Sequence, residues 1–263
     1  MENVIKNTSI KVGITGQSGF IGTHLYNFLG TKANVSRISF LNEYFTSEIE
    51  MNNFVKKCDV IIHLAAMNRH GNPQLIYDTN INLVKSLIKA CEDTQSKPYI
   101  IFSSSIHEKG DNFYGRSKME GRSLFESWAK RNKTSYSGFI IPNVYGPFGK
   151  SFYNSVVSTF CYQLTHGQAP KIHIDNIVHL IYINSLIELI YQKIEYKDQF
   201  IIPYNFNIET VIIPYDKAIK VSILLKKLEQ YKESYLENGC LPSLFTLFDF
   251  NLFNTFLYYN IEP

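Results

Sequence analysis

Cysteine is scarce in this sequence, and its placement argues against two classes of protein. The four cysteines among 263 residues are Cys58, Cys91, Cys161 and Cys240, without C-x-x-C spacing or paired histidines nearby. A disulfide framework or a zinc site would need closer or paired spacings. We therefore expect reduced thiols and no bound metal.

An excess of one charge and a long apolar run are also missing. The chain has 26 basic and 23 acidic residues, a net charge of +3, and no basic block suited to a nucleic-acid backbone. The first residues, "MENVIKNTSI", lack an apolar signal-peptide core, and polar residues interrupt the most apolar stretch, "IVHLIYINSLIELIYQKI". The sequence predicts a cytoplasmic protein with neither nucleic acid nor membrane as a partner.

Glycine, by contrast, is concentrated near the N-terminus. The stretch "VGITGQSGFIGTHL" carries Gly16, Gly19 and Gly22 between an apolar run and a helical pattern. A strand that runs into a helix leaves the first helical amides unpaired, and glycines remove the side chains that would keep an anion away. The stretch predicts a binding site for a dinucleotide pyrophosphate, although a tight turn that binds no ligand can have the same glycine spacing.

Short apolar runs alternate with helical patterns as far as about residue 145, which is typical of parallel strands joined by crossover helices. We expect an α/β protein with a Rossmann-type doubly wound parallel sheet and a small C-terminal substrate-binding lobe. A single domain, 1–263, would bind the dinucleotide mainly through residues 9–146 and the substrate mainly through residues 147–263. The expected strands are Lys11–Thr15, Val35–Ser39, Val60–Leu64, Tyr99–Ser103 and Gly138–Pro142, and the clearest helices lie in "NINLVKSLIKAC" and "YGRSKMEGRSLFESWAKR".

A second group of residues has catalytic chemistry. The stretch "IFSSSIHEKGDNFYGRSKMEG" places serines at a strand end, shortly before Tyr114 and Lys118. Residues four apart share a helix face, and a nearby ammonium favours the phenolate of a tyrosine, which ordinarily titrates near pH ~10. With a serine hydroxyl on the same oxygen, these groups could protonate a carbonyl as a hydride arrives. Y-x-x-x-K alone is weak evidence in a chain rich in both residues.

Six motifs occur in a fixed order that extends the pattern to about residue 190. The set resembles the extended short-chain dehydrogenase/reductase superfamily, which includes nucleotide-sugar epimerases, dehydratases and reductases. The motifs are "TGQSGFIG" (Thr15–Gly22), "DVIIHLAA" (Asp59–Ala66), "TNINLVKSL" (Thr79–Leu87), "FSSS" (Phe102–Ser105), "YGRSK" (Tyr114–Lys118) and "PNVYGP" (Pro142–Pro147).

Four longer stretches look like the reductase domain of the capsular-polysaccharide enzymes that form UDP-2-acetamido-2,6-dideoxy-β-L-talose. In those enzymes a cupin domain that epimerises the keto sugar follows, and this sequence stops at Pro263, about where a cupin would begin. The resemblance implies NADPH-dependent 4-keto reduction of a UDP-linked 6-deoxy-hexosamine for a capsular or surface polysaccharide, a homodimer, and a separate epimerase as partner. The stretches are "HLAAMNR", "SSSIHEKGDNFYGRSKMEG", "YNSVVSTFCYQL" and "LPSLFTLFDFNLFNTFLYY".

The same resemblance implies roles for individual residues. Tyr114 would donate the proton, Lys118 would bind the nicotinamide ribose and lower the tyrosine pKa, and Ser105 would polarise the substrate oxygen. The substrate would contact Ser104, Asn143 and Asn154, and the cofactor would contact Gly16, Ser18, Gly19, Phe20, Ile21, Gly22, His63, Leu64, Ala65, Ala66, Lys118 and Pro142.

The second expected strand bears on cofactor choice. An NAD-selective site has an acidic residue at the end of that strand, whereas a 2′-phosphate needs a cation there. In "NVSRISF" we find Arg37 and no acid, which favours NADP(H) over NAD(H). The other interpretation of Arg37 is an exposed arginine in a loop.

The sequence departs from the usual pattern of this superfamily at two sites, and three functions other than 4-keto reduction stay open. Ile141 stands where an arginine often precedes the Pro-Asn pair, and Asn184 and Ser185 replace a later acidic pair, which affects substrate-phosphate contacts rather than hydride chemistry. The alternatives are a nucleotide-sugar 4-epimerase, a 4,6-dehydratase and a non-catalytic dinucleotide-binding protein. A dehydratase would need an acid beside the catalytic serine, where this sequence has Ile106.

Overall fold

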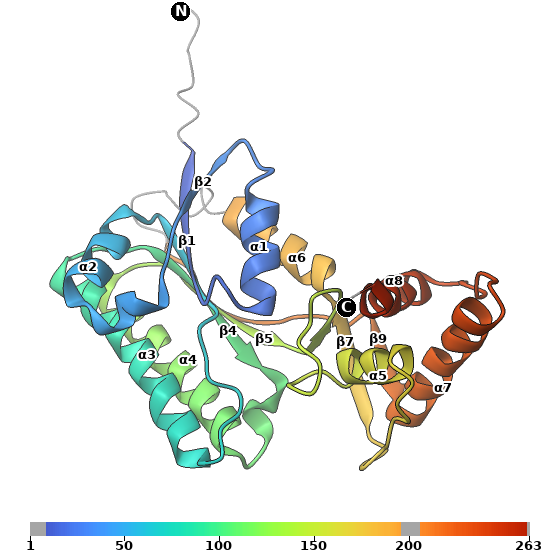
Figure 1. Cartoon of the computed structure of the whole chain (residues 1–263). Helices are drawn as coiled ribbons and strands as arrows, with labels where there is room; N and C mark the ends of the chain where they lie inside the picture. Colours follow the sequence, from blue (N-terminus) through green and yellow to red (C-terminus); the bar gives the residue numbers. More distant parts are fainter. Residues whose placement is uncertain (1–8, 196–205, 262–263) are drawn as a thin grey trace, which may run out of the picture. The chain divides into compact units, whose positions relative to one another are not determined.

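The main sheet confirms the expected doubly wound α/β class. The computed structural model describes residues 9–195 and 206–261 (Figure 1). Six parallel strands lie in the order β2-β1-β3-β4-β5-β8, so the strand order reverses between β1 and β3, where doubly wound sheets bind nucleotides. The strands are β1 (Ile10–Thr15), β2 (Val35–Ile38), β3 (Val60–His63), β4 (Tyr99–Ser105), β5 (Tyr136–Ile141) and β8 (Ile208–Ile212).

Helices cover both faces of this sheet. Figure 1 shows α2, α3 and α4 on one face and α1 and α6 on the other. Phe28 of α1 and Tyr191 of α6 meet edge to face, with ring centroids 5.6 Å apart. The helices are α1 (Phe20–Leu29), α2 (Glu48–Lys57), α3 (Pro73–Asp93), α4 (Phe113–Asn132) and α6 (Ile183–Glu195), with short 3₁₀ turns η1 (Asn42–Thr46) and η2 (Ile106–Lys109).

All five expected strands form, but their ends differ from the prediction by up to two residues. The largest difference at a C-terminal end is in β4, which continues through Ser104 to Ser105 because Ser105 is paired with Ile141 of β5. Those serines are therefore fixed by sheet hydrogen bonding, rather than lying in the loop that follows.

Aromatic side chains fill the core between the sheet and α4. Phe102 of β4 lies against Phe125 of α4, with ring centroids 5.4 Å apart, and both are almost completely buried. Trp128, one turn further along α4, is buried in the same cluster. This packing fixes α4 on the strand that ends in the three serines.

The remaining elements form a second compact unit. One unit comprises Met1–Ile141 and Ile187–Ile212, and the other comprises Pro142–Leu186 and Ile213–Pro263. The expected division lay near residue 146, whereas the first boundary falls between Ile141 and Pro142, and Ile187–Ile212 is grouped with the first unit. The second unit contains β6 (Asn143–Tyr145), α5 (Val156–Thr165), β7 (Ile177–Tyr182), β9 (Lys217–Lys220), α7 (Val221–Tyr231), a π-helical turn η4 (Lys232–Glu237) and α8 (Leu247–Ile261).

The second unit has its own small sheet, in the order β6-β7-β9. Strands β6 and β7 are parallel, and β7 and β9 are antiparallel. Within the described residues, no helix is both long and apolar enough to cross a membrane.

His63, at the end of β3, is a core residue. Its side chain is 0% exposed, its Nδ1 lies 2.9 Å from the Thr15 hydroxyl, and its ring stacks on Phe102. Burial and, to a lesser degree, the nearby Lys118 ammonium lower the pKa of His63 to about 3. The imidazole is enclosed by the core, so any contribution of His63 to a cofactor site would have to come from its backbone, and that contribution stays a prediction.

His63 should make the fold sensitive to acid. An unfolded histidine titrates near pH ~6.5, so below that pH the unfolded chain binds a proton that the fold excludes. The contribution of the neutral His63 to the free energy of unfolding is complete above about pH 6.5 and is lost as the pH falls towards 3. Between pH 7.5 and pH 5, His63→Asn should lose about 2 kcal/mol less unfolding free energy than the wild type, measured in urea.

The exposed His70 provides the control, and His70→Asn should lose as much as the wild type. An equal loss in His63→Asn and the wild type would contradict a neutral, buried His63.

Candidate active site

The glycine turn between β1 and α1 is closed by contacts that admit no side chain. Gly16 has φ +74°, and a Cβ there would lie 2.7 Å from the Ala65 amide nitrogen. A Cβ on Gly22 would lie 2.2 Å from the Gly16 carbonyl oxygen. The turn is thus pressed against the start of α1 on one side and the chain after β3 on the other.

The start of α1 can hold an anion. Gly19 is the N-cap and has no side chain to bond the first helical amides. Those amides, which belong to the turn of Phe20, Ile21 and Gly22, have no carbonyl partner within the helix and carry the positive end of its dipole. The exposed Ser18 precedes them, and half-buried Leu64, Ala65 and Ala66 follow β3 beside the turn. The cradle fits a dinucleotide pyrophosphate.

A cavity of about 330 Å³ adjoins this turn. Phe40, just beyond β2, donates its backbone N–H to the Gln17 side chain at 3.3 Å, which ties the cavity wall to the glycine turn. Of the lining residues, only Ser18 was named from the sequence as a cofactor contact. Gln17 lies in the same glycine motif, and the remaining residues lie on α1 or follow β2 and belong to no motif. The lining residues are Gln17, Ser18, Thr23, Tyr26, Phe40, Leu41, Asn42 and Glu43.

Arg37 lies within β2 rather than beyond its end. Its guanidinium carbon is 4.2 Å from the centroid of the Tyr26 ring, and Nη1 donates to the Tyr26 carbonyl oxygen at 3.0 Å. Arg37 is exposed, and Tyr26 forms part of the cavity wall. The guanidinium therefore lies beside the cavity, while a carboxylate, Glu43, is one of the lining groups.

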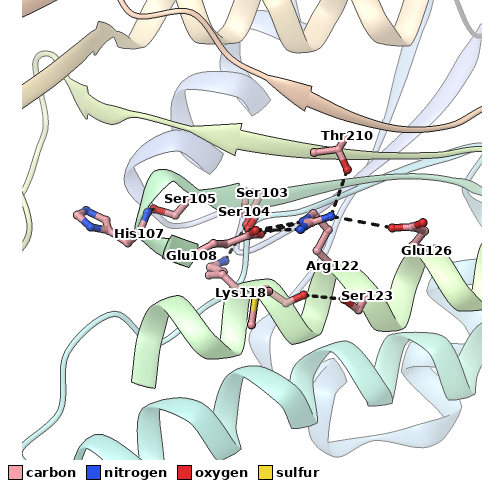
Figure 2. Close-up of polar contacts among 11 residues, drawn as sticks. Ser103, Ser104, Ser105, His107, Glu108, Lys118, Arg122, Ser123, Glu126 and Thr210 are labelled. Carbon is pink, nitrogen blue, oxygen red and sulfur yellow. Dashed lines mark hydrogen bonds and ion pairs between the residues drawn. The ribbon is translucent and has the colours of Figure 1, made fainter. Parts of the chain in front are cut away.

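Lys118 is the most buried charge of the site. Its side chain is on α4, the residue is 3% exposed, and Nζ donates to the Ser103 carbonyl oxygen at 2.9 Å (Figure 2). The rings of Phe102 and Tyr114 lie 5.0 Å and 5.7 Å from Nζ. Burial lowers the pKa of Lys118 to about 7, against the opposing field of Glu108.

Tyr114 lies one helical turn before Lys118. It is half-buried in the first turn of α4, where the Asn112 side chain accepts the Gly115 amide at 2.7 Å. A Cβ on Gly115 would lie 2.1 Å from the His107 carbonyl oxygen, so the start of α4 touches η2. The structure brings the tyrosine ring and the ammonium to one helix face, as the spacing predicts.

The serines at the end of β4 have different partners. Ser105 is 7% exposed, and its hydroxyl oxygen accepts the His107 amide at 3.2 Å. The Ser104 hydroxyl donates to the Glu108 carboxylate. The Ser104 hydroxyl is thereby engaged by Glu108. The expected substrate contacts of Ser104 and Ser105 stay predictions.

The other expected site residues belong to the second unit. Pro142 is buried, the Asn143 amide donates to the His179 carbonyl oxygen at 3.3 Å, and Asn154 is exposed before α5. Their expected contacts with cofactor and substrate stay predictions.

Comparison with known proteins places these features in a family. A model of the NAD dependent epimerase/dehydratase family matches residues 12–208. The UDP-2-acetamido-2,6-beta-L-arabino-hexul-4-ose reductase of Pseudomonas aeruginosa is 27% identical over 179 residues, 68% of this chain and 48% of that protein. The dTDP-D-glucose 4,6-dehydratase of Dictyostelium discoideum is 26% identical over 81% of this chain and 62% of its own length. This chain spans less than two thirds of either relative.

Solved structures show the same fold. The capsular polysaccharide assembling protein CapF from Staphylococcus aureus has a TM-score of 0.76 and 27% identity, covering 97% of this chain and 67% of that one. RMD from Pseudomonas aeruginosa, complexed with NADPH, has a TM-score of 0.79 at 15% identity and covers 97% and 100% of the two chains. At that identity the likeness to RMD concerns the fold alone.

Tyr114 can be tested by removing its hydroxyl. With a keto-sugar nucleotide and reduced cofactor, Tyr114→Phe should lower kcat by roughly 10²–10⁴-fold, the effect of a positioned general acid, and leave cofactor affinity unchanged. Lys118→Met should weaken both, because it would remove the expected ribose contact as well as the cation beside the Tyr114 ring. Steady-state kinetics and cofactor titration measure the two effects.

A matched tyrosine gives the control. Tyr77 on α3 donates its hydroxyl to Glu120, and Tyr77→Phe should keep the wild-type rate. If Tyr114→Phe kept more than about a tenth of that rate, another group would be the acid.

Proposed function

Because the chain belongs to the NAD dependent epimerase/dehydratase family, we propose that it reduces the 4-keto group of a UDP-linked 6-deoxy-hexosamine, with NADPH as hydride donor, in the synthesis of a capsular or surface polysaccharide. The observation that carries the proposal is the Lys118 ammonium buried beside the Tyr114 ring on the helix that follows the serine-tipped strand. The names of the Pseudomonas reductase and the Staphylococcus capsular protein support the substrate class.

Each residue has one task in this reaction. A bound nicotinamide would supply the hydride to the carbonyl carbon. Tyr114 donates its phenolic proton to the carbonyl oxygen, so that the ketone becomes an alcohol and the tyrosine a phenolate. Ser105 donates a hydrogen bond to that oxygen, and Lys118 stabilises the phenolate through its charge. Gly16, together with the start of α1, holds the pyrophosphate.

Dehydration is the second candidate, since one relative is a 4,6-dehydratase. The residue after Ser105 is Ile106, and the nearest acid along the chain, Glu108, is engaged by Ser104 and Arg122. A carboxylate held in this way cannot reach the substrate as an acid or base. The arrangement favours reduction over dehydration.

A 4-epimerase and a non-catalytic dinucleotide-binding protein differ from a reductase because neither consumes the cofactor.

The proposal extends to the setting of the enzyme. We propose a cytoplasmic homodimer that receives its keto sugar from a separate epimerase.

Net cofactor oxidation separates these functions. Incubation with a UDP-4-keto-6-deoxy-hexosamine and NADPH in D₂O should consume one NADPH per sugar reduced and introduce no solvent deuterium at ring carbons. Absorbance at the nicotinamide band and mass spectrometry of the sugar measure both. Deuterium beside the ketone without cofactor oxidation would identify an epimerase that acts through an enolate. Neither change would rule out the reductase and leave a 4-epimerase, a 4,6-dehydratase or a protein that only binds, and conversion of the 4-hydroxy UDP-sugar without added NADPH would separate the enzymes from the binding protein.

Cofactor choice depends on Arg37 and Glu43, which favour opposite cofactors. A guanidinium attracts the 2′-phosphate of NADPH, whereas a carboxylate repels it and accepts the ribose hydroxyls of NADH. Arg37→Ala should weaken NADPH binding by about tenfold, the effect of one charged hydrogen bond, and leave NADH binding unchanged. Glu43→Gln should weaken NADH binding instead.

Fluorescence titration of both cofactors on both variants gives the four affinities. Tighter NADH than NADPH binding by the wild type, with no effect of Arg37→Ala, would overturn the NADPH preference.

A further inference from the structure

A charged pair without an assigned role lies directly behind the serine-tipped strand. The Arg122 guanidinium on α4 binds both oxygens of Glu108 on η2, with Nε 3.0 Å and 3.2 Å from them and Nη2 3.1 Å from Oε2 (Figure 2). The side chains are 9% exposed for Glu108 and 22% for Arg122. A bidentate pair that is this enclosed is screened far less by salt than an ion pair on the surface.

The pair connects the elements that carry the candidate catalytic groups. Glu108 accepts the hydroxyl of Ser104, the residue before Ser105. Arg122 lies one helical turn after Lys118 and two turns after Tyr114, and its Nη1 donates to the Thr210 hydroxyl of β8 at 3.2 Å. One carboxylate and one guanidinium therefore join the end of β4, η2, α4 and β8.

Glu108 is also the counter-charge of Lys118. Of the titratable groups near the ammonium, His63 of β3 is neutral at working pH, and Tyr114 on the same helix is the group that Lys118 serves. On the α3 side, the uncharged amide of Asn80 bonds the neighbouring Ser117. The negative field of Glu108 opposes the lowering of the Lys118 pKa by burial.

We propose that Glu108, clamped by Arg122, is a positioning residue that holds the Ser104–Ser105 end of β4 against α4 and keeps Lys118 charged. The proposal rests on the proposed reductase function. Glu108 touches neither cofactor nor substrate in this account. It acts through Ser104 on the position of Ser105, and through its charge on the ammonium that serves Tyr114.

The test replaces Glu108 by glutamine, which keeps the shape and removes the charge. Glu108→Gln should lower kcat about tenfold with little change in cofactor affinity, and the high-pH limb of the kcat profile should move down by about one pH unit, because a neighbouring charge commonly contributes that much to a pKa. Glu108→Asp, which keeps the charge, should restore the position of that limb. The control is Glu126→Gln, which removes another carboxylate near Arg122, 4.0 Å from Nη1, and should leave kcat and its pH profile unchanged.

A second measurement does not depend on turnover. In protein labelled with ¹³C at lysine Cε, the Lys118 resonance should titrate about one unit lower in Glu108→Gln than in the wild type. If the wild type reduced no keto sugar but the resonance still shifted, the proposed function would fail and the role of Glu108 towards Lys118 would stand. An unchanged resonance together with an unchanged pH profile would overturn the positioning role, even if Glu108→Gln lowered the melting temperature.

Discussion

The burial of the Lys118 ammonium is the constraint on which the rest of the site depends. A charge removed from water is costly unless polar or ionic partners compensate it. Here the Ser103 carbonyl accepts at 2.9 Å, the Phe102 ring lies 5.0 Å away, and Glu108 supplies a negative field. These partners come from β4 and η2, so the helix that carries Lys118 must sit at one register on the strand that ends in Ser105.

The sheet brings distant parts of the chain to one edge. Parallel strands all end on the same side, so the glycine turn after β1, the alanines after β3 and the serines of β4 lie along that edge. The reversal of strand order between β1 and β3 opens the place that the turn occupies. Gly16 and Gly22 allow the backbone of this turn to approach the chain after β3 and the start of α1 more closely than a side chain would permit. The fold thus places the glycine turn in the same unit of the chain as Tyr114 and Lys118.

Much of this arrangement could be predicted from the sequence because it follows local rules. Alternating apolar runs predict parallel strands, and a four-residue spacing predicts that Tyr114 and Lys118 share a face. The pairing of Glu108 with Arg122 could not be predicted, because the two residues are separated by a loop and more than two helical turns and have no motif. The burial of His63 was missed for a similar reason, since a strand pattern does not say which side chain meets Phe102. Arg37 lies inside the strand both as predicted, Val35–Ser39, and as observed, Val35–Ile38, but its contacts with Tyr26 could not be predicted because they depend on how α1 packs beside β2.

The most direct test of the account follows the hydride itself. The protein would be given NADPH stereospecifically deuterated at nicotinamide C4 and a UDP-4-keto-6-deoxy-hexosamine, and the sugar product would be analysed by mass spectrometry and NMR. The account predicts one deuterium at sugar C4 when the transferred face carries the label, and none when the opposite face carries it. A reduced sugar without deuterium from either labelled face, or a fully retained label in the cofactor, would contradict direct hydride transfer by this chain.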